Sequence, residues 1–388
     1  MTGPRDPLLT PAFLELCLFN FAASAAVFAL LPVAPFHIRE LGGPPEAAGL
    51  FLGGLTFASA ATAPWTGAVG DALGQGRVLA ASAAGIALLF ALYALLPTWP
   101  LFVAGALLQG LLWSAVLTSS GAYAVRLIPV HRRAEGIAVH GMATILAISL
   151  APSLGFVLYA FGWRRLAATL GAVNLAIALL ALRFARSEAP SRRSLATAFH
   201  GHGIAWPVLR FALGIFLVAF GYGGLTSFIA LFCEARGIAP KGIYFVAFAG
   251  TMLGLRPFVG RLVDRVGPFR TFAPSLVLVA LALVLLPFAT SRVGIVGGAM
   301  LYGLGFATVG PAFTTYVISR VPAERRGAAF GANIAAFDSG IGSGSIAFGP
   351  LVAHLGYSWT FWIAAAFTLA AWPYLALARA PFERATAE

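Results

Sequence analysis

Charge is scarce in this sequence of 388 residues, and lysine is almost absent. Only 10% of the residues are charged, and Lys241 is the only lysine. Typical soluble domains carry about 25% charged residues. Hydrophobic residues make up 60% of the chain. A soluble protein of this composition could not cover its surface with polar groups, so the sequence predicts a protein embedded in a lipid bilayer.

The residues needed for several kinds of chemistry are also missing. The two cysteines, Cys17 and Cys233, are far apart and form neither a disulfide framework nor a metal-binding spacing. No His, Cys or carboxylate cluster has the spacing of a metal site. The phosphate-binding pattern G-x-x-x-x-G-K-[ST] does not occur, which argues against ATP-driven transport. We therefore expect no metal, no cofactor and no enzymatic activity.

The net charge of +12 comes almost entirely from arginine. A basic chain can indicate nucleic-acid binding. Here the arginines stand singly or in pairs between apolar segments, so they are better explained by membrane topology, and no nucleic-acid partner is expected. The first apolar run continues to Phe36, too long for the roughly 7–15-residue core of a signal peptide, and predicts a retained first helix.

Apolar runs long enough to cross a bilayer recur along the whole chain. A membrane helix needs about 20 mostly apolar residues. Such runs predict an all-α membrane protein of twelve transmembrane helices, near residues 12–36, 47–69, 78–97, 100–124, 135–160, 165–185, 207–232, 243–263, 271–290, 293–318, 328–353 and 357–378.

The basic residues between these runs predict the orientation. With the N-terminus in the cytoplasm, 19 of the 25 basic residues fall on the cytoplasmic side and 6 on the other side. Basic residues concentrate in cytoplasmic loops. The sequence therefore predicts that both termini are cytoplasmic.

Two short polar runs interrupt the apolar pattern at matching places. Residues 260–272 read GRLVDRVGPFRTF and residues 67–79 read GAVGDALGQGRVL, an offset of 260 − 67 = 193, close to half of the chain. The same offset relates Pro64 to Pro257, Gly110 to Gly303, Pro129 to Pro322, and Arg132-Arg133 to Arg325-Arg326. We therefore expect two similar six-helix bundles, residues 1–185 and 207–388, joined by a polar cytoplasmic linker at 186–206.

Two six-helix halves with this polar run between the second and third helices resemble the major facilitator superfamily of secondary transporters. Its signature is roughly G-x-L-A-D-R-x-G-R-K. The second copy is similar to it at Gly260, Leu262, Asp264, Arg265 and Gly267, whereas the first copy keeps Gly67, Asp71 and Gly74 but lacks the arginine after the acid. The resemblance covers essentially the whole chain and implies alternating access between two halves.

Within that superfamily the chain looks most like bacterial drug- and sugar-efflux permeases. The similarity lies in Arg256-Pro257 before the second polar run and in residues 337–344, which read FDSGIGSG. Two positions depart from drug/proton antiporters. Ala106 stands where an arginine often precedes a Gln-Gly pair, and the Gly-Pro-x-x-Gly-Gly signature is reduced to Ala151-Pro152-Ser-Leu-Gly-Phe.

The two polar runs are also candidates for a conformational latch. An acid near a helix N-terminus and nearby arginines is stabilised by about 0.3–1 kcal/mol when exposed, and such a contact across the halves would favour the outward-open state. The alternative is a turn that only aids folding and insertion. The latch candidates are Gly67, Asp71, Gly74, Gly260, Asp264, Arg265 and Gly267. Because the first copy has lost its basic residues, Asp71→Asn is expected to be milder than Asp264→Asn.

Ionisable groups at membrane depth are costly and therefore mark candidate sites for protons or substrate. Asp338 lies 11 residues past Gly327, about 16 Å along a helix and so near the middle of the bilayer. Three further candidates are Glu15, His140 and Arg256. Each has a structural alternative: Glu15 reaches water, His140 is a satisfied interior histidine, and Arg256 pairs with Asp264 or Asp338.

Polar side chains in the helices that line the cavity of similar transporters are candidates for substrate contact. They are Asn20, Gln109, Trp113, Tyr222, Tyr302 and Asn333. Gln109 and Tyr302 are related by the offset of 193, as are His140 and Asn333. Polar groups among many phenylalanines suit an amphipathic organic solute, although each of them could instead serve helix packing.

These observations predict a transporter of the bacterial inner membrane that moves a small organic solute by alternating access, as a proton-coupled exporter and a monomer. The alternatives within the class are a proton-coupled importer or a uniporter of sugars or organic acids. A membrane sensor or enzyme without transport would require a catalytic cluster or a soluble domain, and the sequence contains neither.

Overall fold

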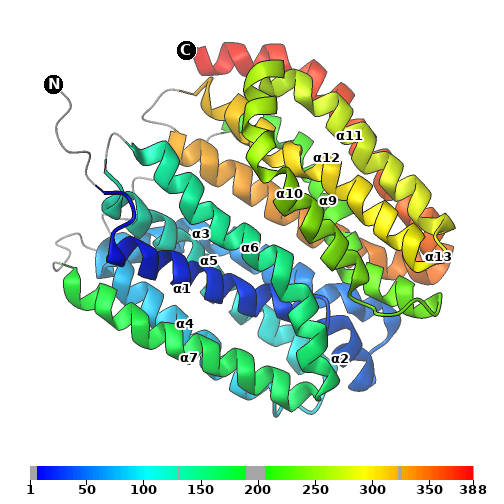
Figure 1. Ribbon diagram of the computed structural model, residues 1–388, viewed down its shortest axis with the longest axis horizontal. Helices are drawn as coiled ribbons and strands as arrows, with labels where there is room; N and C mark the ends of the chain where they lie inside the picture. Colours follow the sequence, from blue (N-terminus) through cyan, green and yellow to red (C-terminus); the bar gives the residue numbers. More distant parts are fainter. Residues whose placement is uncertain (1–6, 130–131, 189–205, 322–325, 388) are drawn as a thin grey trace. The chain divides into compact units, whose positions relative to one another are not determined.

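The computed structural model describes residues 7–129, 132–188, 206–321 and 326–387, and this part of the chain is helical with no strand (Figure 1). Its elements in chain order are α1 (Pro11–Leu30), α2 (Ala34–Glu40), the 3₁₀ helix η1 (Pro45–Gly49), α3 (Leu50–Leu73), α4 (Gln75–Tyr93), α5 (Trp99–Leu127), α6 (Arg133–Ala160), α7 (Trp163–Ser187), α9 (Trp206–Ala235), α10 (Ile243–Val266), α11 (Pro268–Leu285), the 3₁₀ helix η3 (Leu286–Phe288), α12 (Arg292–Ile318) and α13 (Arg326–Ala387). The predicted all-α membrane fold is confirmed.

Within the described residues, ten helical stretches are long and apolar enough to cross a membrane, and a bent pair at residues 45–73 makes an eleventh. The bent pair turns by 56° between Ala63 and Trp65. Pro64 stands at this bend, and proline removes a helix hydrogen bond and kinks the axis. The last stretch contains two helices joined at Gly356, whose φ of 77° is not helical. The predicted count of twelve treats these two arms of α13 as separate crossings.

Local signals explain where several helices begin. Ser291 accepts a hydrogen bond from the backbone nitrogen of Gly294 at 3.3 Å and so caps α12. α11 starts with Pro268, whose missing N–H costs nothing in the first turn of a helix. α1 ends at Leu30 and α2 begins at Ala34, so the predicted first helix, 12–36, is interrupted next to Pro32.

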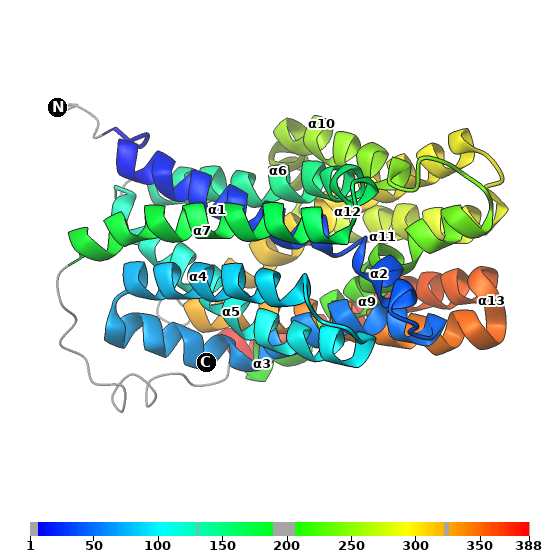
Figure 2. The same cartoon turned by 90° about the horizontal axis from the view of Figure 1, so that it is seen from below.

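The contacts divide the chain into two compact units. Unit 1 contains residues 1–30, 62–96 and 108–201, and unit 2 contains residues 31–61, 97–107 and 202–388. In unit 1, α1 packs along α6 and α4 packs along α7, as both views show (Figures 1 and 2). In unit 2, α9 packs against α13, and α12 packs against α10 and α11. Helices α3 and α5 contribute to both units.

The division into two six-helix bundles, residues 1–185 and 207–388, remains a prediction from the sequence. Most of the predicted linker, 186–206, falls on residues 189–205, which lie outside the described part of the chain.

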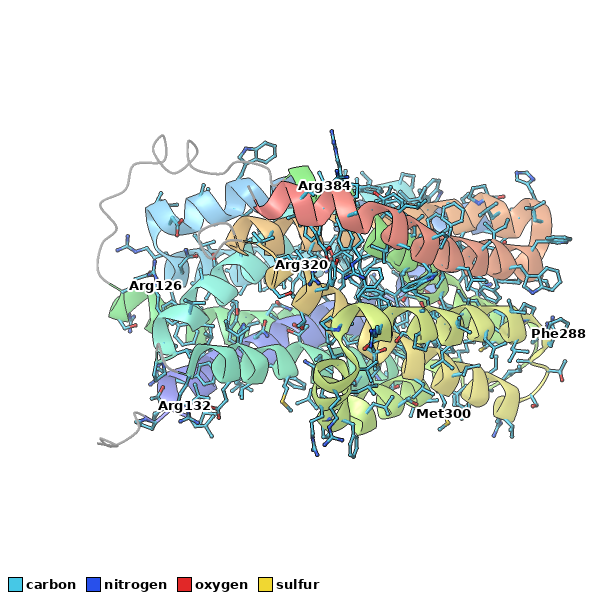
Figure 3. The ribbon with its side chains drawn as sticks, turned by 90° about the horizontal axis from the view of Figure 1, so that it is seen from above. Arg126, Arg132, Phe288, Met300, Arg320 and Arg384 are labelled. Atoms are coloured by element: carbon cyan, nitrogen blue, oxygen red, sulfur yellow. The ribbon has the colours of Figure 1, made fainter. Side chains whose placement is uncertain are left out.

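The arginines labelled in Figure 3 gather at one end of each unit's helices. Arg126 and Arg132 lie at the same end of unit 1, and Arg320 and Arg384 lie at the end of unit 2 opposite Phe288 (Figure 3).

Among the described residues, six glycines have positive φ, and they form three pairs along the sequence. Gly42 pairs with Gly237, Gly74 with Gly267 and Gly162 with Gly356, at offsets of 195, 193 and 194. The backbone of Gly74 (φ 98°, ψ 133°) and that of Gly267 (φ 93°, ψ 139°) are nearly the same. Residues other than glycine rarely adopt this conformation. The two polar runs therefore form the same turn, which supports the repeat predicted from the sequence.

Candidate functional site

Asp338 lies on α13, well inside a stretch that is apolar enough to cross a membrane. It is 338 − 326 = 12 residues past the start of the helix, about 18 Å along its axis. The Ser59 hydroxyl on α3 donates a hydrogen bond to Asp338 Oδ2 at 3.5 Å. Both residues belong to unit 2, although 279 residues separate them in sequence. No ion pair involves Asp338 among the described side chains.

A seam of small residues brings α3 and η1 close to α13 within unit 2. A Cβ atom added to Gly49 would lie 1.8 Å from the backbone oxygen of Ser345, and one added to Gly342 would lie 2.7 Å from Thr56 Oγ1. Gly53 faces Ile346 and Gly342 in the same way. Glycines spaced at helical intervals allow membrane helices to approach closely. We call this contact, from Gly49 and Gly53 to Gly342 and Ser345, the glycine seam, and Asp338–Ser59 lies at its end.

A chain of hydroxyl groups ties the seam to α9. Ser227 on α9 and Ser345 on α13 have their hydroxyl oxygens 2.6 Å apart, and Ser345 donates to the backbone oxygen of Gly49 at 2.7 Å. On its other side α13 approaches α9 just as closely, because a Cβ atom on Gly344 would lie 1.8 Å from the backbone oxygen of Phe220. Contacts from both sides therefore fix the position of the helix that carries Asp338.

His140 is part of a polar group in unit 1. Its Nε2 lies 3.2 Å from the Ser120 hydroxyl on α5, and its backbone oxygen accepts a hydrogen bond from Asn20 Nδ2 at 3.3 Å. Asn20 also donates to Thr144 Oγ1 at 2.9 Å. The structure thus brings together two predicted site residues, Asn20 and His140. Ser120 and Thr144, which complete the group, were not predicted.

Asn333 repeats this arrangement in unit 2. Its Nδ2 donates to Thr314 Oγ1 at 3.2 Å. The pair Asn333–Thr314 corresponds to His140–Ser120, since 333 − 140 = 193 and 314 − 120 = 194. Each polar side chain therefore bonds a hydroxyl on the helix before it. That His140 and Asn333 face a shared cavity remains a prediction.

Glu15 and Arg256 occupy different surroundings. Glu15 Oε1 forms an ion pair with Arg183 on α7 at 2.9 Å, which gives it a structural partner. Arg256 is half-buried on α10, and no ion pair joins it to Asp338 among the described side chains. Its other predicted partner, the carboxylate of Asp264, lies outside them.

Gln109 and Trp113 are buried among the helices of unit 1. The Tyr93 hydroxyl donates to Gln109 Oε1 at 3.0 Å, and Gln109 has no exposed surface. Trp113 meets Phe28 edge to face, with ring centroids 6.5 Å apart. Tyr93 is the last residue of α4, so its hydrogen bond to Gln109 joins α4 to α5. In this conformation both predicted cavity residues make helix-packing contacts.

Tyr222 and Tyr302 both contact Phe306 on α12. The Tyr222 ring stacks on Phe306 with centroids 4.7 Å apart, and the Tyr302 ring stacks on it at 5.6 Å. Tyr302 is fully buried, whereas Tyr222 is half-buried. The structure therefore places these two predicted cavity residues together, and Tyr222 lies on the more open side.

The first polar run is held by an acid that was not predicted. Glu188, which follows α7, accepts a hydrogen bond from the backbone nitrogen of Gly76 at 2.9 Å and forms an ion pair with Arg126. It therefore binds the N-terminus of α4, where a negative charge is favourable. Asp71 accepts a hydrogen bond from Gln75 Nε2 at 3.0 Å. Glu188 is the only acid in residues 186–206, a signal that could have drawn attention to it.

The structure describes only some of the side chains of the predicted conformational latch. The Asp264 side chain and those of Arg133, Arg325 and Arg326 lie outside the described side chains. Arg265 is exposed. A Cβ atom added to Gly67 or Gly260 would meet open space, so neither glycine marks a close helix contact within its own unit. The latch stays a prediction.

At the N-terminus of α6, Arg132 donates two hydrogen bonds to Glu135, at 2.9 and 2.7 Å. These bonds raise the pKa of the Arg132 guanidinium above its usual value. The pair lies within one helical turn. It stabilises this helix end locally.

A family model described as Major Facilitator Superfamily matches residues 16–345 and 241–388. An uncharacterized MFS-type transporter of Burkholderia mallei (strain SAVP1) is 28% identical over 380 residues, which covers 94% of this chain and 91% of the relative. An uncharacterized MFS-type transporter of Pseudomonas aeruginosa (strain LESB58) is 29% identical over 353 residues, covering 89% and 86%.

Solved structures of transporters have the same fold. The human organic anion transporter MFSD10 (TETRAN) aligns with a TM-score of 0.68 at 20% identity, over 96% of this chain and all of its own. The nucleoside transporter NupG, as its D323A mutant, aligns with a TM-score of 0.73 at 15% identity, over 94% and 99%. A bacterial homolog of the human lysosomal transporter Spinster, inward-facing and unoccupied, aligns at 0.73 and 14%, over 99% and 98%. At these identities the likeness concerns the fold alone.

Proposed function

Because the chain belongs to the Major Facilitator Superfamily, we propose that it is a secondary transporter that exports a small amphipathic organic solute in exchange for protons, by alternating access. We place the transporter in the inner membrane of a bacterium, with both termini in the cytoplasm, and we propose that it works as a monomer. The distribution of basic residues, 19 against 6, supports this orientation. Two structural neighbours are named for organic anions and for nucleosides, which are small organic solutes of this size class.

One observation carries the proton coupling: Asp338 is an acid within a membrane stretch, and the side chain that hydrogen-bonds to it is a neutral hydroxyl. An ionised carboxylate is costly in such surroundings unless a cation pairs with it. Without a cationic partner among the described side chains, the acid can relieve this cost by binding a proton. Asp338 is therefore the group that we assign to proton binding.

The glycine seam suggests how the proton would affect conformation. When Asp338 is protonated, it is neutral, and the close packing of α3 on α13 can enclose it at low cost. When Asp338 is ionised, it needs water or a polar ligand, which favours opening of the contact at Ser59. A proton would thus stabilise the closed seam, and its release would favour the open one.

Reconstitution in proteoliposomes with an internal pH indicator tests the proposed function. Adding a transported solute should move protons in the direction opposite to the solute, and empty liposomes provide the control. Movement of protons together with the solute would indicate an importer, and solute movement without protons would indicate a uniporter. Failure of a broad panel of organic solutes to move at all would contradict transport.

A further inference from the structure

Six aromatic rings from four helices form one contiguous group in unit 2. We call it the tyrosine cluster, and it consists of Tyr222 on α9, Tyr244 and Phe248 on α10, Tyr302 and Phe306 on α12, and Phe337 on α13. Phe248 lies between the tyrosines, with ring centroids 6.2 Å from Tyr222, 6.2 Å from Tyr244 and 6.0 Å from Tyr302. The cluster therefore joins all four helices at one place.

Two buried hydroxyl groups inside the cluster have no hydrogen-bond partner in the part of the chain that the structure describes. Tyr244 is 3% exposed and Tyr302 is 0% exposed. Neither hydroxyl makes a hydrogen bond to any described residue. Buried hydroxyls are nearly always hydrogen-bonded because leaving them unpaired is costly. A pair of unpaired donors at one place is therefore a feature that packing alone does not require.

Several ring pairs of the cluster are close to parallel, whereas Phe248 is tilted by 40–58° from Tyr222, Tyr302 and Phe306. The Tyr222 ring makes an angle of 15° with the Phe306 ring and of 25° with the Phe337 ring, and the centroids of Tyr222 and Phe337 lie 6.3 Å apart. Tyr302 makes an angle of 25° with Phe306. Parallel ring faces favour a flat aromatic partner, which can stack on them. Tyr222, Phe306 and Phe337 are the half-buried members, whereas Tyr244, Phe248 and Tyr302 are buried.

We infer that the tyrosine cluster is the substrate-binding site and that it takes a flat aromatic solute with hydrogen-bond acceptors on its edge. The ring faces of Tyr222, Phe306 and Phe337 stack on the solute, and the hydroxyls of Tyr244 and Tyr302 donate to its acceptors. This inference rests on the proposed transport function. It adds Tyr244 to the site and a chemical class to the substrate.

Three carboxamides of similar outline separate stacking from hydrogen bonding. Quinoline-3-carboxamide is flat and has a ring acceptor besides its carbonyl, naphthalene-2-carboxamide is flat without the ring acceptor, and decahydronaphthalene-2-carboxamide is puckered. Equilibrium dialysis against the purified full-length protein measures their dissociation constants. We expect the quinoline to bind about tenfold more tightly than the naphthalene, as one added hydrogen bond allows, and the puckered compound to bind most weakly.

Removing the two hydroxyls tests the donors directly. The double variant Tyr244→Phe, Tyr302→Phe keeps every ring, so the quinoline should lose its preference over the naphthalene, and the naphthalene should also bind more weakly because its carbonyl loses a donor. Because the hydroxyls are unpaired in this conformation, the thermal midpoint should not fall. Tyr316→Phe is the matched control, because the Tyr316 hydroxyl donates to Glu383 at 2.9 Å outside the cluster, and it should leave the preference for the quinoline unchanged.

Equal affinity for the flat and the puckered compounds, no binding of any of the three, or an unchanged preference in the double variant would each overturn this inference. The outcome is independent of proton coupling, because the binding is measured without a membrane or a pH gradient. Binding with the expected preference but no proton movement in proteoliposomes would contradict the proposed function and leave the site intact.

Discussion

Arg39 and Glu234 are 195 residues apart in sequence and form an ion pair, with Arg39 Nη2 and Glu234 Oε2 2.5 Å apart. Lys241 Nζ lies 2.5 Å from the other carboxylate oxygen of Glu234. Both cations also lie over the ring of Phe36, at 5.2 Å for Arg39 and 4.4 Å for Lys241. One acid thus holds two cations in unit 2, and it joins α2 to the end of α9.

Glu234→Gln should destabilise unit 2 modestly, because it leaves Arg39 and Lys241 without their shared carboxylate. The side chains of Arg39 and Glu234 are 43% and 30% exposed, so the coupling between them in a double-mutant cycle with Arg39→Gln should be about 0.2–1 kcal/mol. Thermal unfolding in detergent measures it, and high salt should reduce it. Glu135→Gln, which breaks a pair within one helix, is the control. Strict additivity of the two substitutions would contradict the pairing.

The glycine contacts of α13 predict a large difference between two Gly→Ala substitutions. Gly344→Ala would bring a Cβ atom to 1.8 Å from the Phe220 backbone oxygen, which cannot move without its helix. Overpacking of this kind costs about 1–3 kcal/mol, and the thermal midpoint should fall clearly. Gly297→Ala in α12 places its Cβ atom in open space, and alanine favours helix, so this variant should be as stable as the wild type or more so. Equal stability of the two variants would contradict the close packing of α13 on α9.

The two turns with matching backbone should differ in their response to alanine. Gly74→Ala and Gly267→Ala both force a residue with a Cβ atom into positive φ, at a cost of about 1–3 kcal/mol. At Gly74 the Cβ atom would also lie 2.9 Å from Glu188 Oε2, whereas at Gly267 it meets open space. We therefore expect Gly74→Ala to be the more destabilising, measured by the thermal midpoint. Gly267→Ala being clearly worse would show that Glu188 does not hold the first turn.

The sequence predicts the local features of this protein well, because they depend on nearby residues. The apolar runs correspond to helices, and the repeat of the polar runs corresponds to the matching turns at Gly74 and Gly267. Asp338 was recognisable as a site candidate because an acid is costly inside an apolar run. These predictions require no knowledge of which helices touch.

The contacts that surround the candidate groups could not be predicted. Ser59 meets Asp338 across 279 residues, and Gly76 meets Glu188 across 112 residues. Such pairs depend on how the helices pack, and a single sequence has no signal for them. Gln109 illustrates the limit: its position predicts cavity lining, which stays a prediction, but the sequence does not show that the Tyr93 hydroxyl donates to its side chain.

The most direct test of the account is solute transport driven by a pH gradient in proteoliposomes containing the Asp338→Asn variant. Asparagine keeps the size of the side chain and its contact with Ser59 but cannot bind or release a proton. We expect gradient-driven transport to be lost, while solute binding and the amount of folded protein remain. Asp338→Glu should retain part of the gradient-driven transport because it keeps the titratable group. Unchanged gradient-driven transport by Asp338→Asn would contradict the assignment of Asp338 as the proton-binding group.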